Sequence, residues 1–147
     1  MILLDVAPFK QALKTEGSVV IVPHKNPDGD ALGSCLALYH FLTNQGFECQ
    51  VIAPNGYPDF LSWLPGSEDI LIAENELEKA EDYVRRASLI FTLDFNDLSR
   101  CGALEESISA ATGLKLMINH YIDPKSYAEV IYSDTQMSST CEMVYNL

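Results

Sequence analysis

Residues 18–34 of the chain have the sequence SVVIVPHKNPDGDALGS. Four consecutive apolar residues near its start are typical of a strand that is covered on both faces. A helical pattern begins at its end. Proline and glycine restrict the loop between them, so we expect a shaped loop and not a flexible linker. Loops of this kind lie at the carboxyl edge of a parallel sheet, where α/β proteins bind ligands.

The loop carries one imidazole and two carboxylates, His24, Asp28 and Asp30, at spacings of four and two residues. Imidazole and carboxylate groups are ligands that suit divalent ions such as Mn²⁺. The loop alone leaves two interpretations open. It is either part of a metal site or a polar turn that only caps the following helix.

Apolar strands alternate with amphipathic helices along the rest of the chain. We expect strands at 18–22, 48–53, 70–73, 88–94 and 114–119, with a brief extended piece at 130–132. We expect helices at 5–16, 30–45, 59–64, 76–87 and 103–111, and a last helix that is capped by Ser139 or Thr140, with Glu142 near the capping-box position. This order predicts an α/β fold: a three-layer domain with a mostly parallel sheet of about five strands and helices on both faces.

The composition of the 147 residues is typical of one globular domain. No apolar run approaches the roughly 20 residues that a membrane helix needs, and the N-terminus lacks a signal-peptide pattern. The four cysteines form no Cys-x-x-Cys pair, so we expect free thiols and a cytoplasmic location. The net charge of −12 argues against a duplex nucleic acid partner and leaves room for a small phosphorylated substrate held through metals.

Two other strand ends carry groups that can bind a metal. Asp94 ends the expected fourth strand, and His120 follows the fifth. Because the carboxyl ends of parallel strands share one edge, we expect both to meet the three loop residues there. Three carboxylates and two imidazoles suit two divalent ions about 4 Å apart, which can activate a water and stabilise a phosphoryl displacement. Taken singly, Asp94 also fits a solvated strand end, and His120 a hydrogen-bonded structural imidazole.

The loop His24-x-Asn26-Pro27-Asp28-Gly29-Asp30-Ala31-x-Gly33-Ser34 resembles the first motif of the DHH family of phosphoesterases. Asp94 followed by Arg100 is similar to that family's second motif. FLSWLPG at 60–66 and SSTCEMVY at 138–145 look like the branch that acts on short oligoribonucleotides and 3′-phosphoadenosine 5′-phosphate. The resemblance covers nearly the whole chain.

The resemblance implies a hydrolase that depends on Mn²⁺, with Mg²⁺ as the alternative. It implies that His24 and Asp28 hold one ion, that Asp30 and His120 hold the second, and that Asp94 bridges them. The nucleophile would be the water between the two ions. The implied substrates are short oligoribonucleotides or 3′-phosphoadenosine 5′-phosphate.

The third motif departs from the family's pattern, which is Asp-His-His, because this chain has Asn119-His120-Tyr121. Asn119 keeps the shape of aspartate without its charge, so it holds a neighbouring group less strongly. Tyr121 replaces an imidazole that contacts the phosphate in the family, and a phenol carries no positive charge near pH 7. The resemblance implies that the catalytic residues are Asp94, His120 and Tyr121, and that the substrate contacts are Asn26, Arg100 and Tyr121.

The family's fourth motif and its second, substrate-binding domain would follow residue 147. We therefore expect residues 1–147 to be the N-terminal domain of such a phosphoesterase, truncated in its last helix and without the C-terminal domain. One hypothesis is an active phosphoester hydrolase, with pyrophosphate or a cyclic dinucleotide as other substrates. The other is a catalytically impaired remnant that binds only a metal or a partner. We further expect no membrane partner, a homodimer formed through exposed apolar surface, and Trp63 packed in the core or at a domain interface.

Overall fold

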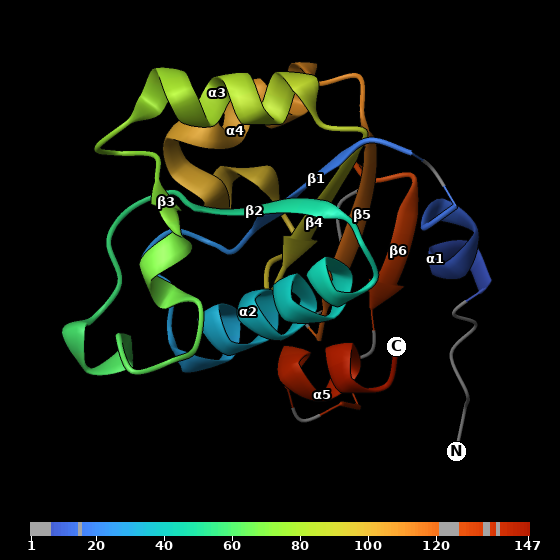
Figure 1. Cartoon of the computed structure of the whole chain (residues 1–147), viewed down its shortest axis with the longest axis horizontal. Coiled ribbons are helices and arrows are strands. Elements are labelled where there is room, and N and C mark those ends of the chain that lie inside the picture. Colours follow the sequence, from blue (N-terminus) through green and yellow to red (C-terminus); the bar gives the residue numbers. More distant parts are fainter. Residues whose placement is uncertain (1–6, 15, 121–126, 134–135, 138) are drawn as a thin grey trace.

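The computed structural model describes residues 7–14, 16–120, 127–133, 136–137 and 139–147. Within these residues, six strands form one parallel sheet with helices on both faces (Figure 1). The strands are β1 (Ser18–Val22), β2 (Glu48–Ala53), β3 (Leu71–Ile72), β4 (Leu89–Leu93), β5 (Leu114–Asn119) and β6 (Val130–Ser133). The helices are α1 (Ala7–Ala12), α2 (Gly29–Asn44), α3 (Leu77–Arg86), α4 (Glu105–Ala110) and α5 (Thr140–Tyr145). Short 3₁₀ segments lie at Asp59–Leu61, Ser67–Asp69 and Leu98–Leu104.

The sheet separates two apolar cores, because alternate residues of a strand point to opposite faces. Val19 and Ile21 of β1 face the core beneath α1, α2 and α5. Val20 and Val22 face the core beneath α3 and α4. Figure 1 shows α3 and α4 together on one side of the sheet, with α2 and α5 on the other. The three-layer α/β architecture that the sequence predicts is therefore confirmed.

Three elements differ in detail from the sequence prediction. The extended piece at 130–132 is a full edge strand, β6, whose residues pair with β5 from Leu116↔Val130 to Asn119↔Ser133. The expected helix at 103–111 begins earlier as the 3₁₀ segment Leu98–Leu104 and kinks at Gly102 (φ 56°), a conformation that favours glycine. The expected helix at 59–64 is only the 3₁₀ turn Asp59–Leu61, because Pro65 disfavours helical backbone at the residue before it.

The order of the strands in the sheet is β3-β2-β1-β4-β5-β6. From β1 the chain moves outward to β2 and β3, then crosses back to place β4 on the other side of β1. In open α/β sheets, ligands bind outside the carboxyl ends of the strands at the point where the strand order reverses. The loops that follow β1 and β4 flank that point, and they carry His24 and Asp94.

Two aromatic side chains of the β2–β3 connection are unusually exposed. Phe60 is 74% and Trp63 is 73% exposed. Of the two expected positions of Trp63, the core is therefore wrong for the described part of the chain, and a domain interface stays a prediction. The reason is local: the turn directs Leu61, which is 6% exposed, inward instead. None of the described helices combines the length and apolar character needed to span a membrane.

Candidate metal centre

His24 follows β1 by two residues and is 5% exposed. Its Nδ1 lies 2.7 Å from the carbonyl oxygen of Lys25. Because a carbonyl can only accept, Nδ1 carries a proton, which leaves Nε2 as the nitrogen that can bind a cation. That Nε2 is buried without a hydrogen bond among the described residues, and it lies 3.3 Å from Asp94 Oδ2. An imidazole oriented through one nitrogen with a free lone pair on the other is arranged as metal ligands usually are.

Asp94 leaves the end of β4 in a left-handed backbone conformation, with φ of 66°. Aspartate is one of the few residues other than glycine that adopts this conformation readily. Its carboxylate is 1% exposed and accepts a hydrogen bond from Thr140 Oγ1 at 3.0 Å. Burial raises the pKa of Asp94, although the adjacent His24 imidazole and the hydrogen bond from Thr140 oppose the increase. Left-handed backbone and a buried charge at one residue are features that concentrate at functional sites.

The side chain of Asp30, in the first turn of α2, is held by hydrogen bonds from the start of α5. The backbone N–H of Thr140 donates to Asp30 Oδ2 at 3.0 Å, and that of Cys141 donates to Oδ1 at 2.9 Å. Burial by itself would raise the pKa of Asp30, but these two N–H groups stabilise the carboxylate and the pKa is lowered. Thr140 and Cys141, which follow Asp30 by 110 and 111 positions in the sequence, therefore fix this carboxylate in its ionised form.

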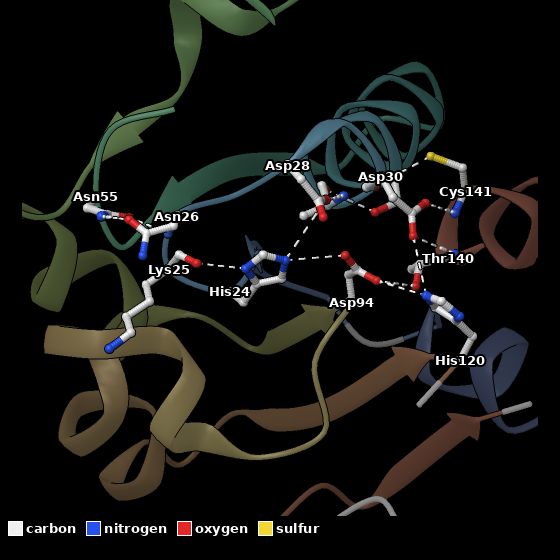
Figure 2. Close-up of polar contacts among 12 residues, drawn as sticks. His24, Lys25, Asn26, Asp28, Asp30, Asn55, Asp94, His120, Thr140 and Cys141 are labelled. Carbon is white, nitrogen blue, oxygen red and sulfur yellow. Dashed lines mark hydrogen bonds and ion pairs between the residues drawn. The ribbon is translucent and has the colours of Figure 1, made fainter. Parts of the chain in front are cut away.

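Asp28 and His120 complete the cluster from two other elements. Asp28 caps α2, because its Oδ1 accepts the Ala31 N–H at 2.9 Å, and it lies 4.0 Å from His24 Nε2. His120 follows β5, and its Nε2 lies 3.4 Å from Asp94 Oδ1 and 3.6 Å from Asp30 Oδ2. Figure 2 shows Asp94 between the two imidazoles, with one carboxylate oxygen toward each.

These contacts form two triads that share Asp94. One is His24, Asp28 and Asp94, the other is Asp30, Asp94 and His120, and the ligand atoms of each triad lie within 4.8 Å of one another. Asp28 also caps α2, so this residue is both a ligand candidate and a helix cap. Carboxylates and imidazoles at these distances, with the lone pair of a buried nitrogen directed at them, fit a pair of divalent cations.

The loop of the first triad is held by a pair of asparagines, Asn26 and Asn55, shown in Figure 2. The Asn26 N–H donates to Asn55 Oδ1 at 2.6 Å, and Asn55 Nδ2 donates to Asn26 Oδ1 at 2.7 Å. Asn26 has a φ of 54°, a left-handed conformation, between the ligand candidates His24 and Asp28. The structure therefore places the Asn26 side chain against Asn55, where it fixes the shape of the loop.

Asn55→Ala is expected to weaken Mn²⁺ binding about tenfold, the lower end of the effect of removing outer contacts of a metal site. The substitution leaves His24 and Asp28 in place but releases the backbone between them. Calorimetric titration of the metal-free chain with Mn²⁺ measures the change. Asn44→Ala, an exposed substitution in the last turn of α2, is the matched control. Equal affinities of the two variants would contradict the role of the asparagine pair.

The structure places Arg100 beside the same loop, because its backbone carbonyl accepts the Lys25 N–H at 2.6 Å. Its role as a substrate contact remains a prediction, as does that of Asn26. Tyr121 lies outside the described residues. Asn119 is fully buried, and its Oδ1 accepts a hydrogen bond from Ser133 Oγ at 3.2 Å, which links β5 to β6.

Sequence reasoning missed the contacts of Thr140, Cys141 and Asn55 with the site. Ser139 caps α5 through a hydrogen bond from the Glu142 N–H, as expected, but this pattern says nothing about what the next residue contacts. The one available signal was the similarity of residues 138–145 to the family, which marks the segment without assigning its role.

Thr140→Val is expected to lower the free energy of unfolding by about 2 kcal/mol, because it removes a hydrogen bond to a buried carboxylate and keeps the size of the side chain. That is about 4–8 °C in Tm for a chain of this length. Thermal denaturation at neutral pH measures it. Thr140→Ser keeps the hydroxyl and serves as the control. If valine and serine at 140 give the same Tm, the bond to Asp94 contributes nothing.

A cluster of carboxylates and imidazoles at the switch point of a parallel sheet defines the class: an α/β protein with a candidate two-cation centre. Residues 18–147 match the DHH family, N-terminal domain. The chain belongs to the DHH family of phosphoesterases.

Two bacterial relatives share this part of the chain. It is 26% identical over 133 residues to the probable bifunctional oligoribonuclease and PAP phosphatase NrnA of Streptococcus mutans. It is 29% identical over 132 residues to the bifunctional oligoribonuclease and PAP phosphatase NrnA of Thermus thermophilus. Each match covers 90% of this chain, but the chain spans only 38% and 36% of the lengths of the two relatives.

A solved structure shares the fold. The crystal structure of an exopolyphosphatase-related protein from Bacteroides fragilis superposes with a TM-score of 0.94 at 40% identity. It covers 96% of this chain, which in turn covers 42% of that protein. The similarity supports the same domain architecture for both proteins.

Proposed function

We propose that this chain is the metal-binding N-terminal domain of a phosphoester hydrolase that acts on short oligoribonucleotides or 3′-phosphoadenosine 5′-phosphate. The observation that carries the proposal is the pair of triads that share Asp94 at the carboxyl edge of the sheet. The names of the two NrnA relatives supply the substrate class. We further propose that the substrate-binding domain of the family lies outside these 147 residues. We also propose that the protein acts in the cytoplasm.

In this proposal His24 and Asp28 hold one divalent ion, Asp30 and His120 hold the other, and Asp94 contacts both. Bound ions supply Lewis acids for the phosphoryl oxygens and ease the deprotonation of an attacking water. Mn²⁺ or Mg²⁺ is proposed because the cluster consists of carboxylate oxygens and imidazole nitrogens. The nearby Cys141 offers no thiolate at neutral pH, because burial raises the pKa of its thiol to about 12.

The protein's own groups orient these ligands. The Lys25 carbonyl holds the proton of His24 on Nδ1, so that Nε2 is available. Thr140 Oγ1 fixes one oxygen of Asp94, and two backbone N–H groups of α5 keep Asp30 ionised. A carboxylate that is already ionised and oriented loses little conformational freedom when it binds an ion or faces a reacting phosphate.

The test is to incubate the chain with a short oligoribonucleotide or with 3′-phosphoadenosine 5′-phosphate, with and without Mn²⁺. The substrate is used at millimolar concentration so that weak binding does not hide turnover, because the chain spans less than two fifths of the length of the NrnA relatives. Release of mononucleotide or phosphate that requires Mn²⁺ is expected. The absence of turnover with every divalent ion, in this chain and in a chain fused to the remaining domain of a relative, would contradict the proposal.

A second candidate is a remnant that binds metal without hydrolysis. Asn119 and Tyr121 favour it, because neither carries the charge that the family has at these positions. It shares the metal centre with the first candidate, so the two differ only in turnover. Binding of Mn²⁺ without hydrolysis in the fused chain would support this second function.

A further inference from the structure

Helix α5 is too short to be stable by itself. It has six residues, Thr140–Tyr145, and isolated helices of fewer than about 12 residues are marginal in water. Its buried side chains, Met143 and Val144, pack into the core that it shares with α1 and α2. Its far end faces solvent, because Tyr145 is 87% exposed. The helix therefore depends on its contacts with the rest of the domain.

A metal-ligand candidate supplies most of the hydrogen bonds at the start of α5. The first N–H groups of a helix have no partner within the helix itself. Those of Thr140 and Cys141 donate to the two carboxylate oxygens of Asp30. The next N–H group, that of Glu142, donates to the hydroxyl of Ser139. Two of these three capping bonds therefore end on a residue of the second triad, which consists of Asp30, Asp94 and His120.

Helices α2 and α5 approach each other closely at this point. A Cβ atom at Gly33 would lie 3.2 Å from Cys141 Sγ, which is tighter than ordinary van der Waals contact. The Cys141 thiol donates to the backbone carbonyl of Asp30 at 3.4 Å. Figure 1 shows α5 lying against α2. Since the bonds to the Asp30 carboxylate measure only 2.9 and 3.0 Å, a movement of α5 away from α2 breaks them.

The hydrogen bonds from α5 reach the two triads unequally. Asp94 Oδ1 and Asp30 Oδ2 are the two oxygens that face His120. Both accept a hydrogen bond from Thr140, one from its hydroxyl and one from its N–H (Figure 2). In the part of the chain that the structure describes, the other two residues of the first triad accept no hydrogen bond from α5. The helix therefore contacts the first triad only through the shared Asp94.

We infer that the docking of α5 on α2 and the binding of a cation at the second triad are coupled, so that each strengthens the other. The inference rests on the metal centre of the proposed function. A carboxylate oxygen has more than one lone pair, so it can accept the bond from Thr140 and bind a cation at once. The docked helix restrains the two oxygens that the cation needs. The coupling is reciprocal, because binding free energies are linked in both directions.

Amide hydrogen exchange of the original chain, with and without saturating Mn²⁺, tests the coupling without any substitution. Exchange of the α5 amides, followed by mass spectrometry, is expected to slow about tenfold when Mn²⁺ binds, a typical size for such a coupling. Helix α4 is the internal control, because it also has six residues but lies on the other face of the sheet. Unchanged exchange in α5, or equal slowing in α4 and α5, would overturn the inference.

The reverse effect is tested by loosening α5 at a distance from the ligands. Val144→Ala trims the buried face of α5, four residues beyond Thr140, and is expected to weaken one of two bound Mn²⁺ ions about tenfold. Val84→Ala removes the same atoms from α3 in the other core and should leave both affinities unchanged. Asn55→Ala loosens the loop of the first triad, so the double variant Asn55→Ala/Val144→Ala is expected to weaken both ions.

Calorimetric titration gives the two affinities, and electron paramagnetic resonance shows how many ions per chain are needed before a spin-coupled Mn²⁺ pair forms. Circular dichroism of each variant verifies the fold. Equal affinities of Val144→Ala and Val84→Ala, or an equal loss at both ions in Val144→Ala, would overturn the coupling.

Hydrolysis enters none of these measurements, so the two proposals fail separately. Mn²⁺-dependent turnover with no effect of Mn²⁺ on exchange in α5 overturns the coupling and leaves the phosphoesterase in place. Slower exchange in α5 with Mn²⁺ but no turnover overturns the hydrolase and supports the coupling in a domain that only binds metal.

Discussion

Asp94→Asn is expected to lower turnover about 1,000-fold, because the bridging carboxylate contributes to both ion sites and its loss costs several kcal/mol of transition-state stabilisation. Asparagine keeps the size of the side chain and tolerates the left-handed backbone at this position. It also keeps an oxygen that can accept the hydrogen bond from Thr140. The variant therefore removes one charge at the centre of the cluster and little else.

The same substitution is expected to leave the metal-free chain at least as stable as the original. Asp94 is buried beside Asp30, and burial raises its pKa, which means that the ionised form is destabilised in the fold. With Mn²⁺ at about 100 times its Kd, the original chain should gain about 2.7 kcal/mol. That is about 5–10 °C in Tm, and Asp94→Asn should lose this gain.

Steady-state kinetics and thermal denaturation with and without Mn²⁺ measure both effects. Glu106→Gln removes an exposed carboxylate from α4, far along the chain from the cluster, and is the matched control. If Asp94→Asn retains the Mn²⁺-dependent rise in Tm, the shared position of Asp94 between two ions is refuted.

Tyr121→His is expected to raise kcat about 10–100-fold, less than the roughly 100–1,000-fold effect of a whole donor that faces developing charge, because the phenol already donates. The resemblance to the family implies an imidazole at this position, near the substrate phosphate. An imidazolium can donate a hydrogen bond and carry positive charge, whereas a phenol can only donate. Affinity for Mn²⁺ should stay unchanged, because the family places the metal ligand at the preceding residue, His120.

The comparison variant is Tyr121→Phe, which removes the hydroxyl and keeps the ring. Multiple-turnover kinetics with a short oligoribonucleotide, together with Mn²⁺ calorimetry, separates an effect on the reaction from one on metal binding. A kcat that stays the same in Tyr121→His would contradict a phosphate contact at this position. If all three chains are inactive but bind Mn²⁺, the impaired-remnant hypothesis gains support.

Much of the site could be predicted from the chain because its ligand candidates follow buried strands. The apolar runs that end before His24, Asp94 and His120 identify parallel strands, and the carboxyl ends of such strands meet at one edge. The alternation of apolar strands and amphipathic helices along the chain was enough to predict the three layers of the fold. Local pattern and global fold agree in these segments.

The remaining contacts depend on tertiary packing that no local pattern encodes. Thr140 reaches Asp94 only because α5 packs back against α2, and Asn55 reaches Asn26 across two loops. The 3₁₀ segment Leu98–Leu104, with its kink at Gly102, likewise precedes the helix expected from residue 103 and was not predicted. The exposure of Trp63 could not be predicted either, because hydrophobic patterns cannot distinguish a ring in the core from a ring on the surface.

The central claim is that five residues of this chain hold two divalent ions on either side of Asp94. Crystals soaked in Mn²⁺ and measured at the manganese absorption edge test it most directly. The claim predicts two anomalous peaks about 4 Å apart, one at His24, Asp28 and Asp94 and one at Asp30, Asp94 and His120. The absence of a peak at this cluster, or peaks that do not contact Asp94, would contradict it.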